Sequence, residues 1–293
     1  MTCWARALPL SPVLKAVPRA MTTYLITRTP AKAATLTRAL LEQDAEAQLL
    51  YAPILDPVGT EPEDWEEIAF ALIRGEFSWV TFTSVNGVLG LDALAQGLGQ
   101  SLVELLGAAQ IAAVGRATEA ALVERGLLVD FVPETQSAAG MVDEWLIDEE
   151  WDNPMDETIL AVQGTTASPT LEEGLTDYGY TVATLPVYDM LSYPAENPLT
   201  EQNPADLDAP SGSALTLGEA VTALATTDVL IATSPLLLQT LADAAGSTLP
   251  PTVAIGASTE AAARNLPEQQ RPATITVAAS PAAADLAAAA LAL

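Results

Sequence analysis

Short apolar segments alternate with amphipathic segments from residue 24 to the end of the chain. The first apolar segment, 24–26, precedes a helical pattern with Leu36, Leu40 and Leu41 on one face. Pro30 is expected in the first turn of that helix. Continuous apolar strands between amphipathic helices are typical of parallel sheets covered on both faces. We therefore predict an α/β protein with doubly wound, flavodoxin-like sheets.

The predicted elements follow this alternation throughout. Strands are expected at 24–26, 48–52, 79–83, 111–114, 129–132, 159–162, 181–185, 229–232, 253–255 and 274–277. The later helices are expected at 64–74, 86–95, 117–125, 137–147, 169–178, 214–225, 235–244, 258–266 and 281–290.

The chain is also an internal duplication. WVTFTS at 79–84 matches VLIATS at 229–234, and VGRATEAA at 114–121 matches IGASTEAA at 255–262. The opening unit, 25–53, likewise parallels 160–186. Each repeat begins with a β-α-β unit, continues through a proline-marked connector and ends with three β-α units. Two similar domains are therefore expected to face each other across a cleft.

Charge and composition exclude several classes of function. The formal net charge is −27, and no Lys or Arg occurs between Leu127 and Ala263. Binding to nucleic acid needs a basic stripe, so a nucleic-acid role is not expected. The chain has no His and a single cysteine, Cys3. These counts argue against Ser-His-Asp and Cys-His catalysis, most zinc sites and any disulfide.

Two segments differ from the rest of the chain. Residues 1–20 are basic and proline-rich, and they are interpreted as an extra N-terminal segment before Met21 or as a targeting peptide. The segment Tyr193–Gly212 is acidic and proline-rich, and it is either a solvated spacer or a lid over the cleft. No apolar run reaches the roughly 18 residues of a membrane helix, so we expect a cytoplasmic protein without a membrane partner.

Hydroxyl groups and glycines recur where the predicted strands end. Ligands of open parallel sheets bind at these ends, where helix N-termini offer free N–H groups to carboxylates or phosphates. Plain N-capping explains any single one of them, but recurrence at matched positions in two repeats favours an anion-binding cleft. The residues concerned are Thr83, Ser84, Thr118, Thr233, Ser234, Ser258 and Thr259, with Gly115, Gly164 and Gly256.

Three further side chains are candidates for the cleft. Arg28 follows the first strand and Arg116 follows Gly115, so either could pair with a carboxylate or make a surface contact. Tyr188, beside Pro186, could act as a weak acid in the cleft or serve as a strand aromatic. The nucleotide motifs GxGxxG after a strand and GxxxxGK[ST] are absent.

These residues, taken in order, resemble the uroporphyrinogen-III synthase family. The segments that carry the resemblance are LITRTP at 25–30, FTSVN at 82–86, VGRAT at 114–118, PVY at 186–188 and IGAST at 255–259. The resemblance implies two α/β domains, one of them discontinuous, joined by a two-stranded ladder. Mapped onto this chain, residues 21–52 and 190–293 would form one domain and 59–185 the other. Residues 53–58 and 186–191 would form the ladder.

The resemblance also implies an activity. It is the closure of hydroxymethylbilane, a linear tetrapyrrole, to uroporphyrinogen III, with inversion of ring D and loss of water, without a metal or organic cofactor. Tyr188 would assist hydroxyl departure, and the upstream deaminase is a candidate partner of a monomeric enzyme. The positions implied to bind substrate are Arg28, Thr83, Ser84, Asn86, Arg116, Thr118, Ser234, Ser258 and Thr259.

Two other functions fit the same pattern. The chain could be a two-domain protein that binds a small anion without chemistry, or a synthase-like domain that has lost activity. The product formed from hydroxymethylbilane separates them, because the type III isomer requires an enzyme and the type I isomer forms spontaneously.

Overall fold

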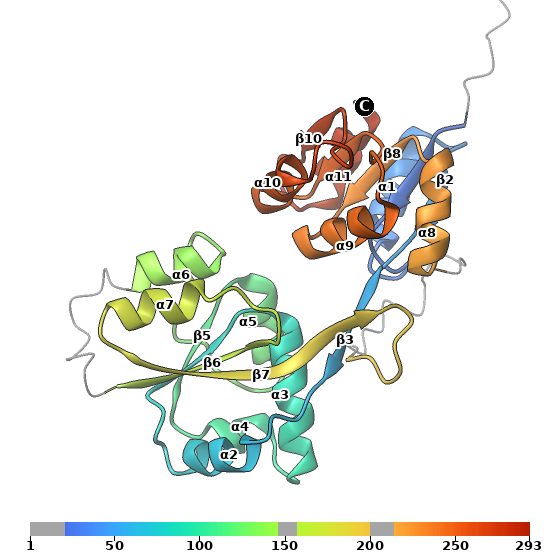
Figure 1. Ribbon diagram of the computed structural model, residues 1–293. Helices are drawn as coiled ribbons and strands as arrows, with labels where there is room; N and C mark the ends of the chain where they lie inside the picture. The colour runs from blue at the N-terminus through green and yellow to red at the C-terminus, as the bar shows by residue number, and fades with distance from the viewer. Residues whose placement is uncertain (1–20, 146–156, 200–213) are drawn as a thin grey trace, which may run out of the picture.

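The computed structural model describes residues 21–145, 157–199 and 214–293. The segment 1–20 and the greater part of the predicted loop 193–212 lie outside the described residues. The described chain forms two five-stranded sheets, each covered by helices, which appear as two lobes in Figure 1. The predicted α/β fold class, with one discontinuous domain, is confirmed; the exact domain boundaries stay a prediction.

The first sheet is entirely parallel, with the strand order β10-β9-β8-β1-β2. Successive residues of its central strand face opposite sides: Tyr24 and Ile26 pack with α1 and α11, whereas Leu25 packs with α8, α9 and α10. The elements of this lobe are β1 (Thr23–Ile26), α1 (Ala34–Gln43), β2 (Gln48–Tyr51), α8 (Leu217–Ala223), the 3-10 helix η3 (Leu224–Thr226), β8 (Val229–Ala232), α9 (Pro235–Ala245), β9 (Thr252–Ala254), α10 (Ala257–Asn265), β10 (Ile275–Val277) and α11 (Ala283–Leu291).

The second sheet is mixed, with the order β3-β7-β6-β4-β5 and only β3 antiparallel to its neighbour. Phe82 and Leu160 pack with α2 to α5 on one face, and Trp79 and Ile159 pack with α6 and α7 on the other. The elements are β3 (Leu55–Gly59), α2 (Trp65–Ile73), β4 (Trp79–Phe82), α3 (Val85–Gly97), α4 (Leu102–Leu106), β5 (Gln110–Ala113), α5 (Arg116–Val123), α6 (Ala138–Trp145), β6 (Thr158–Gly164), α7 (Thr170–Asp177) and β7 (Thr181–Ser192).

The ladder between the lobes is an extension of the second sheet. The sequence predicts a strand that stops at Pro186, but β7 continues through this proline to Ser192 and is 12 residues long in all. Its first half pairs in parallel with β6, and its end pairs antiparallel with β3, from Leu55↔Ser192 to Gly59↔Tyr188. The β6–β7 register shifts between Gln163 and Gly164, next to the proline that cannot donate an N–H.

Two local expectations are wrong, and one helix was not expected. Residues 129–132 form no strand, and only Phe131 makes an isolated bridge, to Ala112. The Asp130 carboxylate accepts the Ile111 N–H at 2.8 Å, so a backbone carbonyl cannot take that position in a ladder. Helix α1 begins at Ala34, after the turn that contains Pro30. Helix α4 was not expected from the sequence; it begins at a capping box formed by Ser101 and Glu104.

Among the described residues, no helix is both long and apolar enough to cross a membrane.

Close packing of α3 on β7 generates a testable prediction. A Cβ at Gly90 would lie 2.6 Å from the Val187 carbonyl oxygen and 2.8 Å from its Cγ2. Gly90→Ala should therefore reduce the free energy of unfolding by about 1–3 kcal/mol, as overpacking does. Gly97→Ala in the same helix is the matched control, because a Cβ there meets nothing within 4 Å.

Urea unfolding followed by tryptophan fluorescence measures this difference. The described tryptophans, Trp65, Trp79 and Trp145, all pack in this lobe. The unfolding midpoint should fall for Gly90→Ala and should not fall for Gly97→Ala. Equal midpoints for the two variants would show that α3 and β7 do not pack as closely as described.

Candidate functional site

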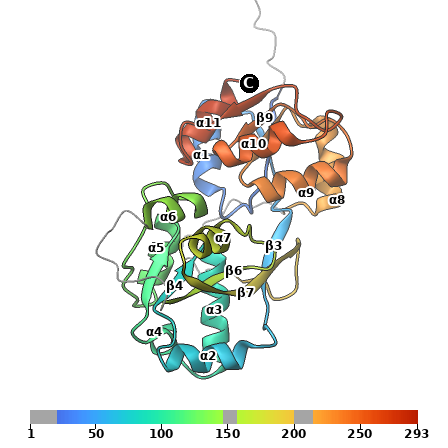
Figure 2. The same cartoon turned by 60° about the vertical axis from the view of Figure 1, so that its left-hand side comes forward.

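A cavity of about 270 Å³ lies between the two lobes. One wall comes from the carboxyl ends of β1 and β8 and from the start of α9, and the other from the ladder and the start of α3. Figure 2 shows β3 between the two lobes. The lining residues are Thr27, Arg28, Thr29, Lys32, Pro53, Leu55, Asp56, Pro57, Asn86, Met190, Thr233, Ser234, Leu236 and Leu237.

Hydrogen bonds between threonines hold the strand ends that form the first wall. β1 and β8 are adjacent parallel strands, so Thr27 and Thr233, which follow them, lie side by side. Their hydroxyl oxygens are 3.0 Å apart, and the Thr233 N–H donates to Thr27 Oγ1 at 2.9 Å. These contacts fix the backbone at the point where helix α9 starts.

Ser234 is the N-cap residue of α9, and its side chain caps no backbone N–H. Pro235 occupies the first turn of the helix, as is common at helix starts. The serine hydroxyl and the N-terminus of an eleven-residue helix therefore both lie at the cavity. Such a helix end favours an anion, because its partial positive charge and its unpaired N–H groups act together.

Two cations line the same cavity. Burial lowers the pKa of the Arg28 guanidinium from its ordinary value, and an arginine in this state keeps its charge. Within the described ranges, neither Arg28 nor Lys32 forms an ion pair. The one acidic side chain in the lining, Asp56, accepts a hydrogen bond from the Ala195 N–H at 3.1 Å. A cavity with unpaired cations in a chain of net charge −27 is suited to an anionic ligand.

Tyr188 lies beside the second wall and is held from three directions. Its phenol oxygen is 3.0 Å from Ser84 Oγ, and its carbonyl oxygen accepts the Thr165 N–H at 2.9 Å. Its ring lies against Gly164, where a Cβ would come within 2.8 Å of Tyr188 Cζ. Asn86 and Met190, two residues beyond Ser84 and Tyr188, line the cavity. Ser84 and Tyr188 themselves are not among the lining residues; their hydroxyl pair lies near the carboxyl ends of β4 and β6.

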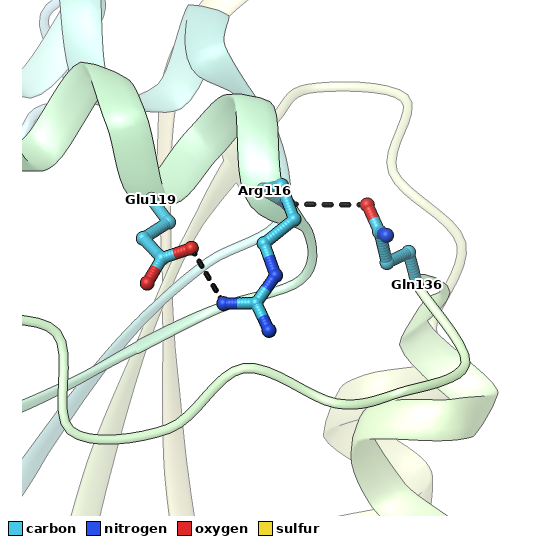
Figure 3. Close-up of polar contacts among 3 residues, drawn as sticks. All are labelled: Arg116, Glu119 and Gln136. Carbon is cyan, nitrogen blue, oxygen red and sulfur yellow. Dashed lines mark hydrogen bonds and ion pairs between the residues drawn. The ribbon is translucent and has the colours of Figure 1, made fainter. Parts of the chain in front are cut away.

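The structure leaves the other candidate residues outside the cavity lining. Arg116, at the start of α5, forms an ion pair with Glu119 at 2.8 Å through its guanidinium group. Its backbone N–H donates to Gln136 Oε1 (Figure 3). Thr118 and Thr259 are buried in helices, and Ser258 is exposed on α10. Thr83 is half-buried between β4 and α3. Of the candidates from the sequence, Arg28, Asn86 and Ser234 line the cavity, and Ser84 and Tyr188 meet beside it.

Several lining residues were missed from the sequence. Lys32 had a detectable signal, because it is one of 11 basic residues and follows Arg28 by four positions. Asp56 and Met190 had no such signal, since their place in the cavity depends on the pairing of β3 with β7. Within the described residues, no group of three or more His, Cys, Asp or Glu side chains could hold a metal ion.

Comparisons with known proteins agree with this architecture. The family model described as uroporphyrinogen-III synthase HemD matches residues 34–286. A mutant uroporphyrinogen III synthase from the extremely thermophilic bacterium Thermus thermophilus is 18% identical, with a TM-score of 0.58; the match covers 90% of this chain and 95% of that one. Uroporphyrinogen-III synthetase from Helicobacter pylori is 15% identical, with a TM-score of 0.54, covering 93% and 99%.

None of the curated proteins compared with this chain matches it. At these identities the two solved structures support the fold alone, whereas the family model extends over most of the chain. The chain therefore belongs to the uroporphyrinogen-III synthase family and is a hydro-lyase of that family.

Proposed function

We propose that this chain closes hydroxymethylbilane to uroporphyrinogen III in the cavity between its lobes. The observation that carries this proposal, beside the family, is a cavity between the lobes whose first wall holds Arg28 and Lys32, which form no ion pair with the described residues, and a serine hydroxyl that caps no backbone N–H. The substrate carries eight carboxylates, and these are the groups that Arg28, Lys32 and the start of α9 are suited to bind.

Arg28 and Lys32 are important for binding a polyanionic substrate because the protein itself carries a large negative charge. Repulsion between the polyanionic substrate and the protein surface is screened beyond about 10 Å at moderate salt. Attraction inside the cavity is screened less, because Arg28 is partly buried. Local donors can therefore bind the substrate despite the net charge of −27.

We infer that the lobes move relative to each other during the reaction, separating to admit the linear tetrapyrrole and closing around it. The β3–β7 ladder is the connection at which such hinge motion would occur. Closure would hold the flexible substrate in the one conformation that places ring D for attack, and such orientation removes several kcal/mol from a barrier.

The proposed chemistry balances with one proton donor. The hydroxymethyl C–O bond breaks as the pyrrole nitrogen lone pair forms an azafulvene, and the hydroxyl leaves as water with the phenol proton of Tyr188. The substituted α-carbon of ring D attacks to form a spirocycle, whose bond to the ring C methylene then breaks. The free α-carbon of ring D closes the macrocycle, and its hydrogen leaves as the proton that restores Tyr188.

The wider setting also belongs to the proposal. Hydroxymethylbilane cyclises spontaneously to the type I isomer, so it must be used soon after it is made. We therefore expect the chain to work in the cytoplasm and to receive the substrate from the upstream deaminase.

Incubation of the full chain with freshly made hydroxymethylbilane tests the function. Formation of the type III isomer above the spontaneous type I background supports the proposal. A chain that binds the substrate but yields type I product alone would instead be an anion-binding protein or an inactive synthase-like domain.

Tyr188→Phe should lower kcat by about 10- to 100-fold with little change in KM. General-acid assistance contributes about 100-fold or more in many enzymes, and an azafulvene is stabilised by resonance, so the effect should lie at the lower end. Tyr178→Phe is the matched control, because Tyr178 is half exposed at the end of α7. Unchanged turnover in Tyr188→Phe would show that the tyrosine is not the acid.

Arg28→Gln should raise KM about tenfold, because a charge-assisted hydrogen bond contributes about 1.5–3 kcal/mol. Lys32→Gln should have a smaller effect in the same direction, since Lys32 is more exposed. Arg38→Gln removes the same charge from an exposed position of α1 outside the cavity lining, and its KM should match that of the unmodified chain. Equal KM values for Arg28→Gln and Arg38→Gln would remove Arg28 from the binding site.

A further inference from the structure

Two serines that the internal duplication places at equivalent positions have different environments. Ser84 follows β4 and is the N-cap residue of α3, and Ser234 follows β8 and is the N-cap residue of α9. Their backbones are nearly the same, with φ −161° and ψ 160° at Ser84 and φ −161° and ψ 144° at Ser234. The difference between them therefore lies in the contacts of the hydroxyl groups.

Ser84 Oγ has two partners. It accepts the Gly87 N–H at 3.1 Å, and it lies 3.0 Å from the phenol oxygen of Tyr188. A serine oxygen that accepts a backbone N–H still has its own proton to donate. That proton can be directed at the Tyr188 oxygen, which leaves the phenol proton of Tyr188 available to a substrate.

Ser234 has neither partner. Its side chain caps no N–H, and the residue faces the cavity. The proline connectors explain why it meets no phenol: two residues after Pro186 the chain has Tyr188, whereas two residues after Pro53 it has Leu55. Leu55 lines the cavity with Ser234 and cannot form a hydrogen bond through its side chain.

We propose that the duplicated serines have divided their roles, which rests on the proposed function above. Ser84 is a positioning residue: it orients the Tyr188 hydroxyl and donates a hydrogen bond to the phenol oxygen as its proton leaves. Ser234 binds a substrate carboxylate together with the N-terminus of α9. Ser84 is thereby removed from the set of carboxylate-binding residues that the family resemblance suggested.

The surroundings of Tyr188 support a positioning role. The ring cannot turn toward β6 because it packs against Gly164, and its backbone is fixed by the Thr165 N–H. The contact given for the phenol O–H is the one with Ser84, which is therefore placed to restrict the rotation of this group. Ser84 is the N-cap residue of the thirteen-residue helix α3. The partial positive charge at this helix N-terminus favours negative charge on the Tyr188 phenol oxygen as the phenol proton leaves.

Steady-state kinetics of matched variants on hydroxymethylbilane test the division. Ser84→Ala should lower kcat about tenfold and leave KM within about twofold, and Ser84→Thr, which keeps the hydroxyl, should restore at least half of kcat. Ser234→Ala should show the reverse, with KM raised at least fivefold and a small change in kcat. In a chain that already carries Tyr188→Phe, Ser84→Ala should cause less than a twofold further loss of kcat.

Loss of a helix cap must be separated from loss of positioning. Ser101→Ala removes a cap of the same chemistry from α4, whose side-chain partner is Glu104 and not Tyr188, and should leave kcat unchanged. Thermal melting of Ser84→Ala and Ser101→Ala establishes that both variants are folded at the assay temperature.

Three results would overturn the division: a raised KM with normal kcat in Ser84→Ala, losses from Ser84→Ala and Tyr188→Phe that multiply fully, or equal losses of kcat in Ser84→Ala and Ser101→Ala. Each of them leaves the proposed function standing if the unmodified chain forms the type III isomer. Type I product alone from the unmodified chain would overturn both proposals.

Discussion

The antiparallel pairing of β3 with the end of β7 is the interaction on which the two-lobed structure depends. Five residue pairs form it, from Leu55↔Ser192 to Gly59↔Tyr188. Immediately before β3 the buried Ile54 has φ 68°, and the Leu55 N–H donates to the Pro53 carbonyl at 2.7 Å across it. A positive φ at a β-branched residue costs about 1–3 kcal/mol, so the surrounding contacts must maintain this turn. The strands that join the lobes also place Asp56 and Met190 in the cavity lining and Tyr188 against Ser84, so a change in the ladder would alter lobe orientation and site geometry together.

The fold could be predicted where local pattern and tertiary packing agree. β8 lies at 229–232, as expected. A continuous run of apolar residues is typical of a strand that is buried on both faces of a parallel sheet. Prediction failed where a side chain or a neighbouring strand decides the outcome. Asp130 replaces a strand carbonyl at the sheet edge, and β3 supplies partners that extend β7 beyond Pro186. Neither effect has a signal within a short window of the sequence.

The candidate site could be predicted by residue type and position, but not by contact. A serine or threonine after each strand is visible in the sequence, and the same pattern describes Ser84, Ser234 and Thr259. The structure gives each a different environment: a phenol, a cavity and a fully buried helix position. Arg116 and Arg28 also follow strands, yet Glu119, three residues after Arg116, forms an ion pair with it, whereas Arg28 forms none with the described residues. The Arg116 pair is a local i,i+3 contact that the sequence does contain.

Duplication produces two similar lobes, and the site arises from the positions at which the two copies differ. In one lobe a tyrosine lies two residues after Pro186 and brings its hydroxyl group to Ser84 at the N-terminus of α3. In the other lobe a leucine lies two residues after Pro53, and Ser234 at the N-terminus of α9 lines the cavity beside Arg28 and Lys32. A symmetric pair of such ends would present two equivalent anion-binding surfaces and no donor. In the proposed ring closure the substrate is bound at one lobe while a proton is delivered from the other, so the difference between the two lobes would turn a binding cleft into a site for directed chemistry.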